Sequence, residues 1–325
     1  TGTATVRNNG SQLLVSETLT VGQSGQGTLT IQNGATVNAK NLNIGRDLDS
    51  LGQVTLSGQN SSLNVTQNAV VGGALASDGG AGTLTINAGT TANVGGQLTI
   101  WSQGEVQLNG GTLQLATLND QGGLFQWNQG TVEFTQNTVL QAGLLNALVG
   151  SGHSLTNGQY LNGSSGTTLI VGTTNFSVDG GQINGTAFTN VGDTVINKGS
   201  VNMTGSFLND VQGNMVVQSL GQTNFIGGVQ NNGNFSLGGP GAKSSGGLFQ
   251  NNGTLSGSGR LQHQLDNHGS LVINGGDYLV VAHSANVNHN LGQIQMSGGR
   301  LEYTGTLSNE ANALLTGRGV LAASS

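Results

Sequence analysis

The sequence predicts an all-β fold, a right-handed parallel β-helix (β-solenoid) with three short strands per coil. Two observations support this prediction: a repeated alternation of apolar and polar residues, and a composition of 58 Gly and 1 Pro in 325 residues. Gly and Asn tolerate the positive φ angles that tight corners need, whereas Pro removes a backbone donor from an interior strand. The chain therefore has the composition of stacked coils joined by many corners.

The first repeat is a Gly-x-apolar-x-apolar unit in the first third of the chain. It begins at Gly27, Gly52, Gly82 and Gly104, with steps of 25, 30 and 22 residues. Each unit is followed by a Gly or Asn turn and a second short strand. A third strand ends in an apolar residue and Gly at 44–45, 71–72 and 94–95. Period-2 alternation points one set of side chains inward and the other outward. The predicted inward set includes Leu29, Ile31, Leu84, Ile86, Leu271 and Ile273.

A second repeat, Asn-x-Gly-x-apolar, follows in the last third of the chain. It begins at Asn197, Asn231, Asn251, Asn267 and Asn290. Asn at the same corner of successive coils predicts an inward stack, in which each amide bonds to the coil beside it. The coils here are shorter and less regular than the first ones.

We expect one continuous solenoid in three parts: N-terminal coils over 1–118, irregular middle coils with a loop over 119–190, and C-terminal coils over 191–325. Within the middle part, 143–150 is either a short helix or a wider coil, and 151–166 reads as a loop. The segment 238–247, which holds the single Pro, is expected to leave the solenoid as a surface excursion.

Composition excludes several classes of protein. A net charge of −6 with only 8 Lys and Arg argues against nucleic-acid binding, which needs clustered cations. No apolar run approaches the roughly 18 residues of a membrane span. The absence of Cys excludes disulfides and thiolate metal sites. A chain that begins at Thr1 without Met is either exported and processed or trimmed.

Residues 21–115 resemble the repeat shared by autotransporter (type V secretion) passengers and PEP-CTERM-associated exported β-helix proteins. The resemblance lies in 21–22, 27–31, 33–37 and 44–45, with copies that begin at Gly52 and Gly82. It implies a secreted or surface-exposed β-helix of a Gram-negative bacterium, in an adhesive or structural role.

We predict no catalytic, cofactor-binding or metal-binding residues. Asp47 and Asp49 form the closest acidic pair and leave open a weak calcium site, but a solvated turn is the simpler interpretation. Catalysis by Glu105, Asp120 and Glu133 would need their coil positions to align on one face.

The histidines and aromatics leave open two further kinds of site. His153, His263, His268, His283 and His289 lack a metal-binding spacing, so we expect exposed polar turn positions. Trp101, Phe125 and Trp127 would stack on sugar rings if they were exposed together. Packing in the core or at the end of a coil is the expectation, because large aromatic side chains are mostly buried.

The repeats favour an extracellular structural protein and not an enzyme: a subunit of a surface filament or adhesive rod that assembles end to end, with surface glycans as other partners. The alternative is a carbohydrate-active β-helix, a polysaccharide lyase or tailspike-like hydrolase. A third hypothesis is ice or mineral binding by rows of Thr, which break at Gln107. Residues 1–6 are strand-like and uncapped, and 314–321 leave apolar residues near the other end. We therefore expect the contact between subunits to form through both ends of the chain. A fragment trimmed from a longer rod would have the same uncapped ends.

Overall fold

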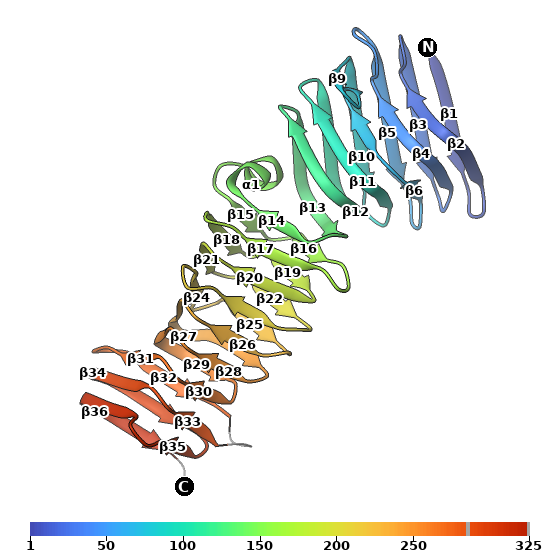
Figure 1. Ribbon diagram of the computed structural model, residues 1–325. Coiled ribbons are helices and arrows are strands. Elements are labelled where there is room, and N and C mark those ends of the chain that lie inside the picture. The colour runs from blue at the N-terminus through green and yellow to red at the C-terminus, as the bar shows by residue number, and fades with distance from the viewer. Residues whose placement is uncertain (284–286, 324–325) are drawn as a thin grey trace. The chain divides into compact units, whose positions relative to one another are not determined.

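The computed structural model describes residues 1–283 and 287–323 and confirms a parallel β-solenoid of about 15 turns (Figure 1). Strands hold 67% of the residues and helix 2%, so the prediction of little helix is also correct. The chain forms two compact units. The N-terminal unit comprises 1–138, 143–152 and 158–164, and the C-terminal unit comprises 139–142, 153–157 and 165–325. In the described residues, no helix has the length and apolarity needed to cross a membrane.

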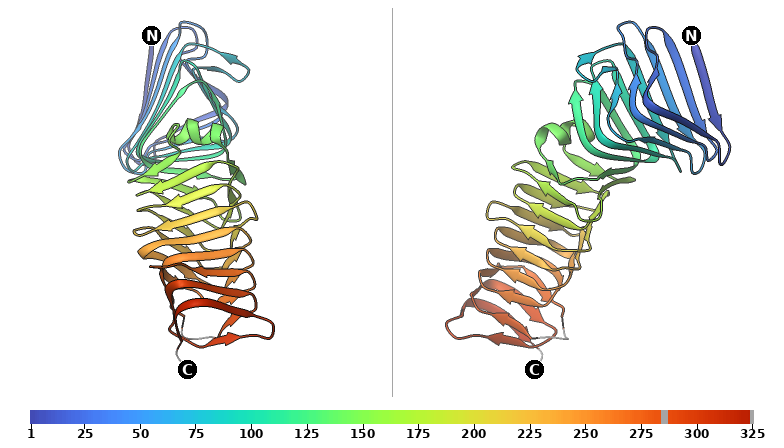
Figure 2. Two further views of the ribbon diagram at one scale, coloured as in Figure 1. Left: turned by 90° about the vertical axis from the view of Figure 1, so that its left-hand side faces the viewer. Right: turned by 45° about the vertical axis from the view of Figure 1, so that its right-hand side comes forward.

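Each coil has three sides, which we call the first, second and third in chain order, and strands on one side pair in parallel with those of the neighbouring coils (Figure 2). In the N-terminal unit the first sides are β1 (Gly2–Arg7), β3 (Gln26–Gln32), β5 (Leu51–Ser57), β10 (Ala81–Asn87) and the starts of β12 (Gly104–Gln121) and β13 (Leu124–Phe134). The second and third sides are β2 (Gln12–Val21), β4 (Thr36–Ile44), β6 (Ser62–Val65), β7 (Ala69–Val71), β11 (Thr91–Trp101), the rest of β12 and β13, and β16 (Gln159–Gly163).

In the C-terminal unit the first sides are β15 (Ser154–Thr156), β18 (Asn175–Asp179), β21 (Asp193–Ile196), β24 (Asn214–Gln218), β27 (Asn234–Gly246), β29 (Thr254–Gln262), β31 (Ser270–Ile273), β34 (Gln293–Tyr303) and β36 (Leu314–Ala323). The second sides are β19 (Gln182–Gly185), β22 (Ser200–Met203), β25 (Gln222–Phe225), β32 (Tyr278–Val281) and the later parts of β27, β29, β34 and β36. The third sides are β14 (Thr138–Leu140), β17 (Thr168–Val171), β20 (Ala187–Asn190), β23 (Phe207–Asn209), β26 (Val229–Asn231), β28 (Phe249–Asn251), β30 (Leu265–Asn267), β33 (Asn288–Asn290) and β35 (Leu307–Asn309).

The interior of the N-terminal unit consists of aliphatic layers. Leu29, Val54 and Leu84 occupy one register position on successive coils, and each is at most 2% exposed. All six side chains predicted to point inward are buried. The 30-residue step from Gly52 to Gly82 contains an inserted antiparallel hairpin, β8 (Gly73–Ala74) with β9 (Ser77–Asp78).

A column of Gly forms the corner that closes each of the first three coils. Gly22, Gly45 and Gly72 have φ angles of +74°, +68° and +82°. A Cβ on any of them would overlap backbone atoms at the start of the first side two coils further on, so only Gly fits. The prediction that Val94 and Gly95 form the same corner was wrong, because Val94 ends the second side and pairs with Val65. At the corresponding corner the chain has Trp101.

The interior of the C-terminal unit adds a buried polar ladder. The last residue of each strand from β20 to β35 on the third side is Asn, and the first six of these side chains are 0% exposed. Each amide donates from Nδ2 to Oδ1 of the next Asn over 2.6–2.9 Å: Asn190, Asn209, Asn231, Asn251, Asn267, Asn290 and Asn309. The predicted asparagine stack is therefore confirmed, but it begins at Asn190. Asn197 lies at a different corner and bonds to Asp179.

The ladder also explains an irregular repeat. In the Asn-x-Gly-x-apolar repeat, Val211 stands two residues before Gly213, where Asn is expected. Asn209 takes the place of this Asn in the ladder, and its Nδ2 donates to the carbonyl of Gly213 across a longer corner. Beside the ladder, phenyl rings stack through the core, with centroids of Phe207 and Phe225 4.5 Å apart and nearly parallel.

Two predicted departures from the solenoid are also wrong. The segment 151–166 contains β15 and β16, because its short apolar positions, such as Leu155 and Leu161, find parallel neighbours in the stack. All but the last residue of the segment 238–247 stays in β27, where the chain turns a wide corner with Pro240 exposed and Ala242 buried. The segment 143–150 is helical, as α1 (Ala142–Val149).

Candidate functional site

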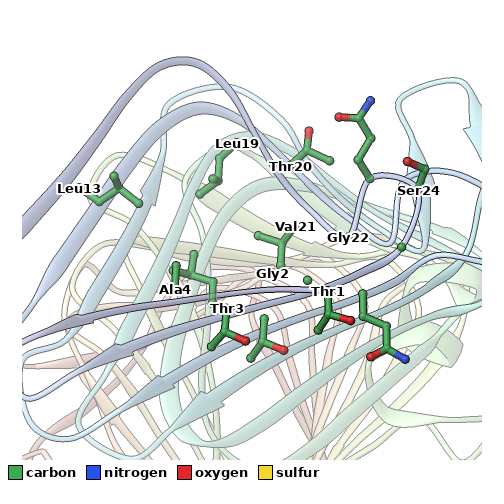
Figure 3. A pocket seen from close by; sticks show the side chains of 16 residues that line it. Thr1, Gly2, Thr3, Ala4, Leu13, Leu19, Thr20, Val21, Gly22 and Ser24 are labelled. Atoms are coloured by element: carbon green, nitrogen blue, oxygen red, sulfur yellow. The ribbon is translucent and has the colours of Figure 1, made fainter.

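The first coil of the N-terminal unit presents an open end. β1 pairs with β3 over six residues, and its other edge meets no strand among the described residues. Gly2 to Thr5 are exposed. A hollow of about 580 Å³ lies at this end, lined by β1, by β2, by the turn that follows β2 and by the start of β3 (Figure 3).

The residues that line this hollow favour binding of a β-strand over binding of a charged ligand. Ala4, Leu13, Leu19 and Val21 line it with apolar side chains, and its lining residues include no Asp, Glu, Lys, Arg or His. A free edge of a parallel sheet carries backbone N–H and C=O groups that bond to any strand of matching length.

The last coil of the C-terminal unit has similar dimensions. β36 pairs with β34 over five residues on the first side and four on the second, and β35 pairs with β33 over three on the third. At the other end of the chain, the first coil pairs over six residues on the first side, four on the second and four on the third. Leu314, Leu315 and Val320 are 55%, 51% and 49% exposed on this last coil.

The three acids considered for catalysis lie on three different sides of their coils. Glu105 is on the first side next to Thr83 and Leu124, and Glu133 is on the second side next to Gln114. Asp120 is on the third side next to Ile100, and its Oδ1 accepts from the N–H groups of Gly122 and Gly123. These three acids therefore do not align on one face, as catalysis by them would require.

Within the described ranges 1–283 and 287–323, the turn that holds Asp47 and Asp49 places no third acid beside this pair. Asp49 is exposed with a φ of +61°, and the carboxylate of Asp47 lies 3.8 Å from Arg46 Nε. In the described residues, no three His, Cys, Asp or Glu side chains are grouped so that they could hold a metal ion.

The expectation of exposed turn positions is wrong for His263. Its side chain is 0% exposed; Nδ1 donates to Gly247 O at 2.8 Å, and Nε2 accepts from Ser244 Oγ at 2.9 Å. Thr223 Oγ1 donates in turn to Ser244 Oγ. Desolvation lowers the pKa of His263 to about 4, so the ring is neutral at pH 7.

The other histidines occupy separate positions. His268 is exposed and His153 bonds to Asn175 O, while His283 is half-buried. His289 Nδ1 lies 2.7 Å from Glu310 Oε1, and this contact lowers the pKa of the Glu310 carboxyl.

The aromatics mainly pack, as expected. Trp127 is 6% exposed and donates from Nε1 to Gly130 O. Phe125 lies edge-on to it and is half-buried in a hollow of about 320 Å³ between β13 and α1, which Asp120 also lines. Trp101 is half-exposed on the third side, away from the other two.

The Thr rows are longer than the sequence repeat indicated. Thr5, Thr30, Thr55 and Thr85 are in register on four coils, and Gln107 interrupts the row as expected. Thr5 lies in a copy of the repeat whose apolar residues are smaller, because Ala4 and Val6 stand in register with Leu29 and Ile31.

No family model and no curated protein match this chain. Among solved structures, the chain is similar to a crystal structure of a TibA fragment hyper-glycosylated by TibC, with 17% sequence identity and a TM-score of 0.29. The match covers 97% of this chain and 100% of that fragment.

Proposed function

We propose that this chain is an extracellular or cell-surface structural protein of a Gram-negative bacterium, a subunit of a filament or adhesive rod that assembles end to end. The observation that carries the proposal is the free parallel edge of β1, together with a last coil in the other unit whose paired lengths are similar to those of the first coil. Contacts between unlike ends generate open filaments where the rotation from one subunit to the next does not close a ring.

The proposed role is structural and not catalytic. Its support is the separation of Glu105, Asp120 and Glu133 onto three sides, because glycoside hydrolysis needs a pair of carboxyl groups that face one substrate. The hollow with Phe125 and Asp120 is the feature that favours the alternative, a carbohydrate-active β-helix.

A charge placed at the open end tests the assembly. Ala4 faces the interior position of β1 and lines the hollow, and its neighbour Thr5 faces outward. Ala4→Lys should abolish filaments, because the incoming coil would bury an unpaired ammonium group. Thr5→Lys, the matched control, should assemble normally. Sedimentation velocity and electron microscopy measure both, and equal assembly of the two variants would contradict the proposed contact.

A further inference from the structure

The second side of the C-terminal unit carries two cations in direct register. Lys243 of β27 and Arg260 of β29 are Cα partners on adjacent coils, a separation of about 4.8 Å. In the part of the chain that the structure describes, neither side chain forms a salt bridge. Like charges directly opposite each other destabilise a sheet, and an anion bound between them removes that cost.

An ordered aromatic ring lies on the same side, one coil further on. Tyr278 is 44% exposed, and its hydroxyl donates to Glu302 Oε2 at 2.8 Å. Arg300 Nη2 donates to the same oxygen at 2.9 Å, and its guanidinium carbon lies 5.5 Å from the ring centroid. Both hydrogen bonds lower the pKa of Glu302, so this carboxylate stays charged and holds the ring in place.

The segment 243–318 is less acidic than the chain as a whole. It holds four of the 8 Lys and Arg, namely Lys243, Arg260, Arg300 and Arg318, together with four Asp and Glu, so its net charge is zero against −6 for the whole chain. Glu302 is committed to Arg300 and Tyr278, although it also feels the charge of Arg260. The carboxylate of Asp277 bonds to Ser258 Oγ and to the Asn274 N–H. We call Lys243, Arg260, Tyr278 and Arg300 the basic stripe.

We propose that the basic stripe binds an acidic polysaccharide. Lys243 and Arg260 would take carboxylate or sulfate groups, since charge-assisted hydrogen bonds to such groups are strong. Tyr278 would pack against the face of a sugar ring. Three cations on a chain with a net charge of −6 are too few to favour nucleic acid, which needs an extended basic surface. This inference goes beyond the end-to-end assembly and does not depend on it.

The test measures binding of polygalacturonate, a polyuronate, by affinity electrophoresis of the full chain at low salt. The double variant Lys243→Gln/Arg260→Gln should bind at least tenfold more weakly, and should melt no lower than the intact chain, because it removes a like-charge pair. Lys198→Gln is the matched control: Lys198 lies on the same unit, 61% exposed and 4.0 Å from Asp179, and its loss should change binding less than twofold.

A second pair of variants isolates the ring. Tyr278→Phe and Tyr278→Leu both lose the hydroxyl that bonds to Glu302, but only the former keeps an aromatic face. We expect near-normal binding for the former and a severalfold loss for the latter. Absence of polygalacturonate binding by the intact chain, equal binding by the double variant, or equally tight binding of duplex DNA would each overturn the proposal.

Discussion

The two units have the same three-sided coil, but different interiors. The N-terminal unit is filled by aliphatic layers such as Leu29, Val54 and Leu84, with a Gly column at one corner. The C-terminal unit adds the asparagine ladder and a stack of phenyl rings. Aliphatic layers accept any residue of similar volume, whereas each amide in the ladder needs a partner at one exact position on both neighbouring coils. The difference indicates that register is set by packing in one unit and by buried hydrogen bonds in the other.

The largest effect should come from a charge in the aliphatic layers. Leu84→Asp removes a side chain that is 1% exposed and buries a carboxyl group with no partner, which should cost on the order of 5 kcal/mol in the free energy of unfolding. Thr85→Asp, one residue further on, faces outward and should cost less than about 1 kcal/mol. Urea denaturation measures both. Similar losses would mean that the inward and outward assignments are wrong.

The next largest effect should come from the ladder. Asn251→Asp replaces an amide whose Nδ2 donates to Asn267 Oδ1 and to Ser270 O, and leaves both acceptors buried without a donor. The expected cost is roughly 4 kcal/mol. Asn252→Asp makes the same chemical change at an exposed corner and should cost under about 1 kcal/mol. If both variants unfold at the same urea concentration, the ladder does not set the register of the C-terminal unit.

The smallest of these effects is a pH dependence confined to the C-terminal unit. The pKa of His263 is about 4 in the folded chain, against about 6.5 when unfolded, so the unfolded state binds more protons between these values. Stability should be full above pH 6.5 and fall by about 3 kcal/mol as the pH drops to 4.

Half-buried His283 makes an electrostatic contribution to the lowered pKa of His263, after desolvation, and the N-terminal unit contains no His. The check is thermal melting across this pH window, with His263→Gln as the control that should lose most of the dependence. An unchanged slope in that variant would assign the effect to other groups.

The coil interior could be predicted from sequence because alternation alone decides which side chains point inward. Corners could not, because their neighbours depend on coil lengths that vary. Trp101 takes a corner that Gly fills in earlier coils, and His263 is buried by Ser244 and Gly247, 19 and 16 residues earlier. The register of Lys243 with Arg260 could not be predicted for the same reason, because the 17-residue step between them differs from the steps between the neighbouring coils.

End-to-end assembly is the central claim, and a cross-linking experiment tests it most directly. The chain has no Cys, so introduced thiols report one contact only. Thr5 lies in the middle of β1 and Thr316 near the middle of the first side of β36, both outward and exposed. Strands paired at about 4.8 Å bring such residues within the Cα separation that a disulfide needs.

The double variant Thr5→Cys/Thr316→Cys should form a ladder of covalent oligomers under oxidising conditions, and each single variant should remain largely monomeric on a non-reducing gel. Oligomers from the double variant, dissolved by reductant, are the result that end-to-end assembly predicts. A double variant that stays monomeric, or efficient dimers from Thr5→Cys alone, would contradict it.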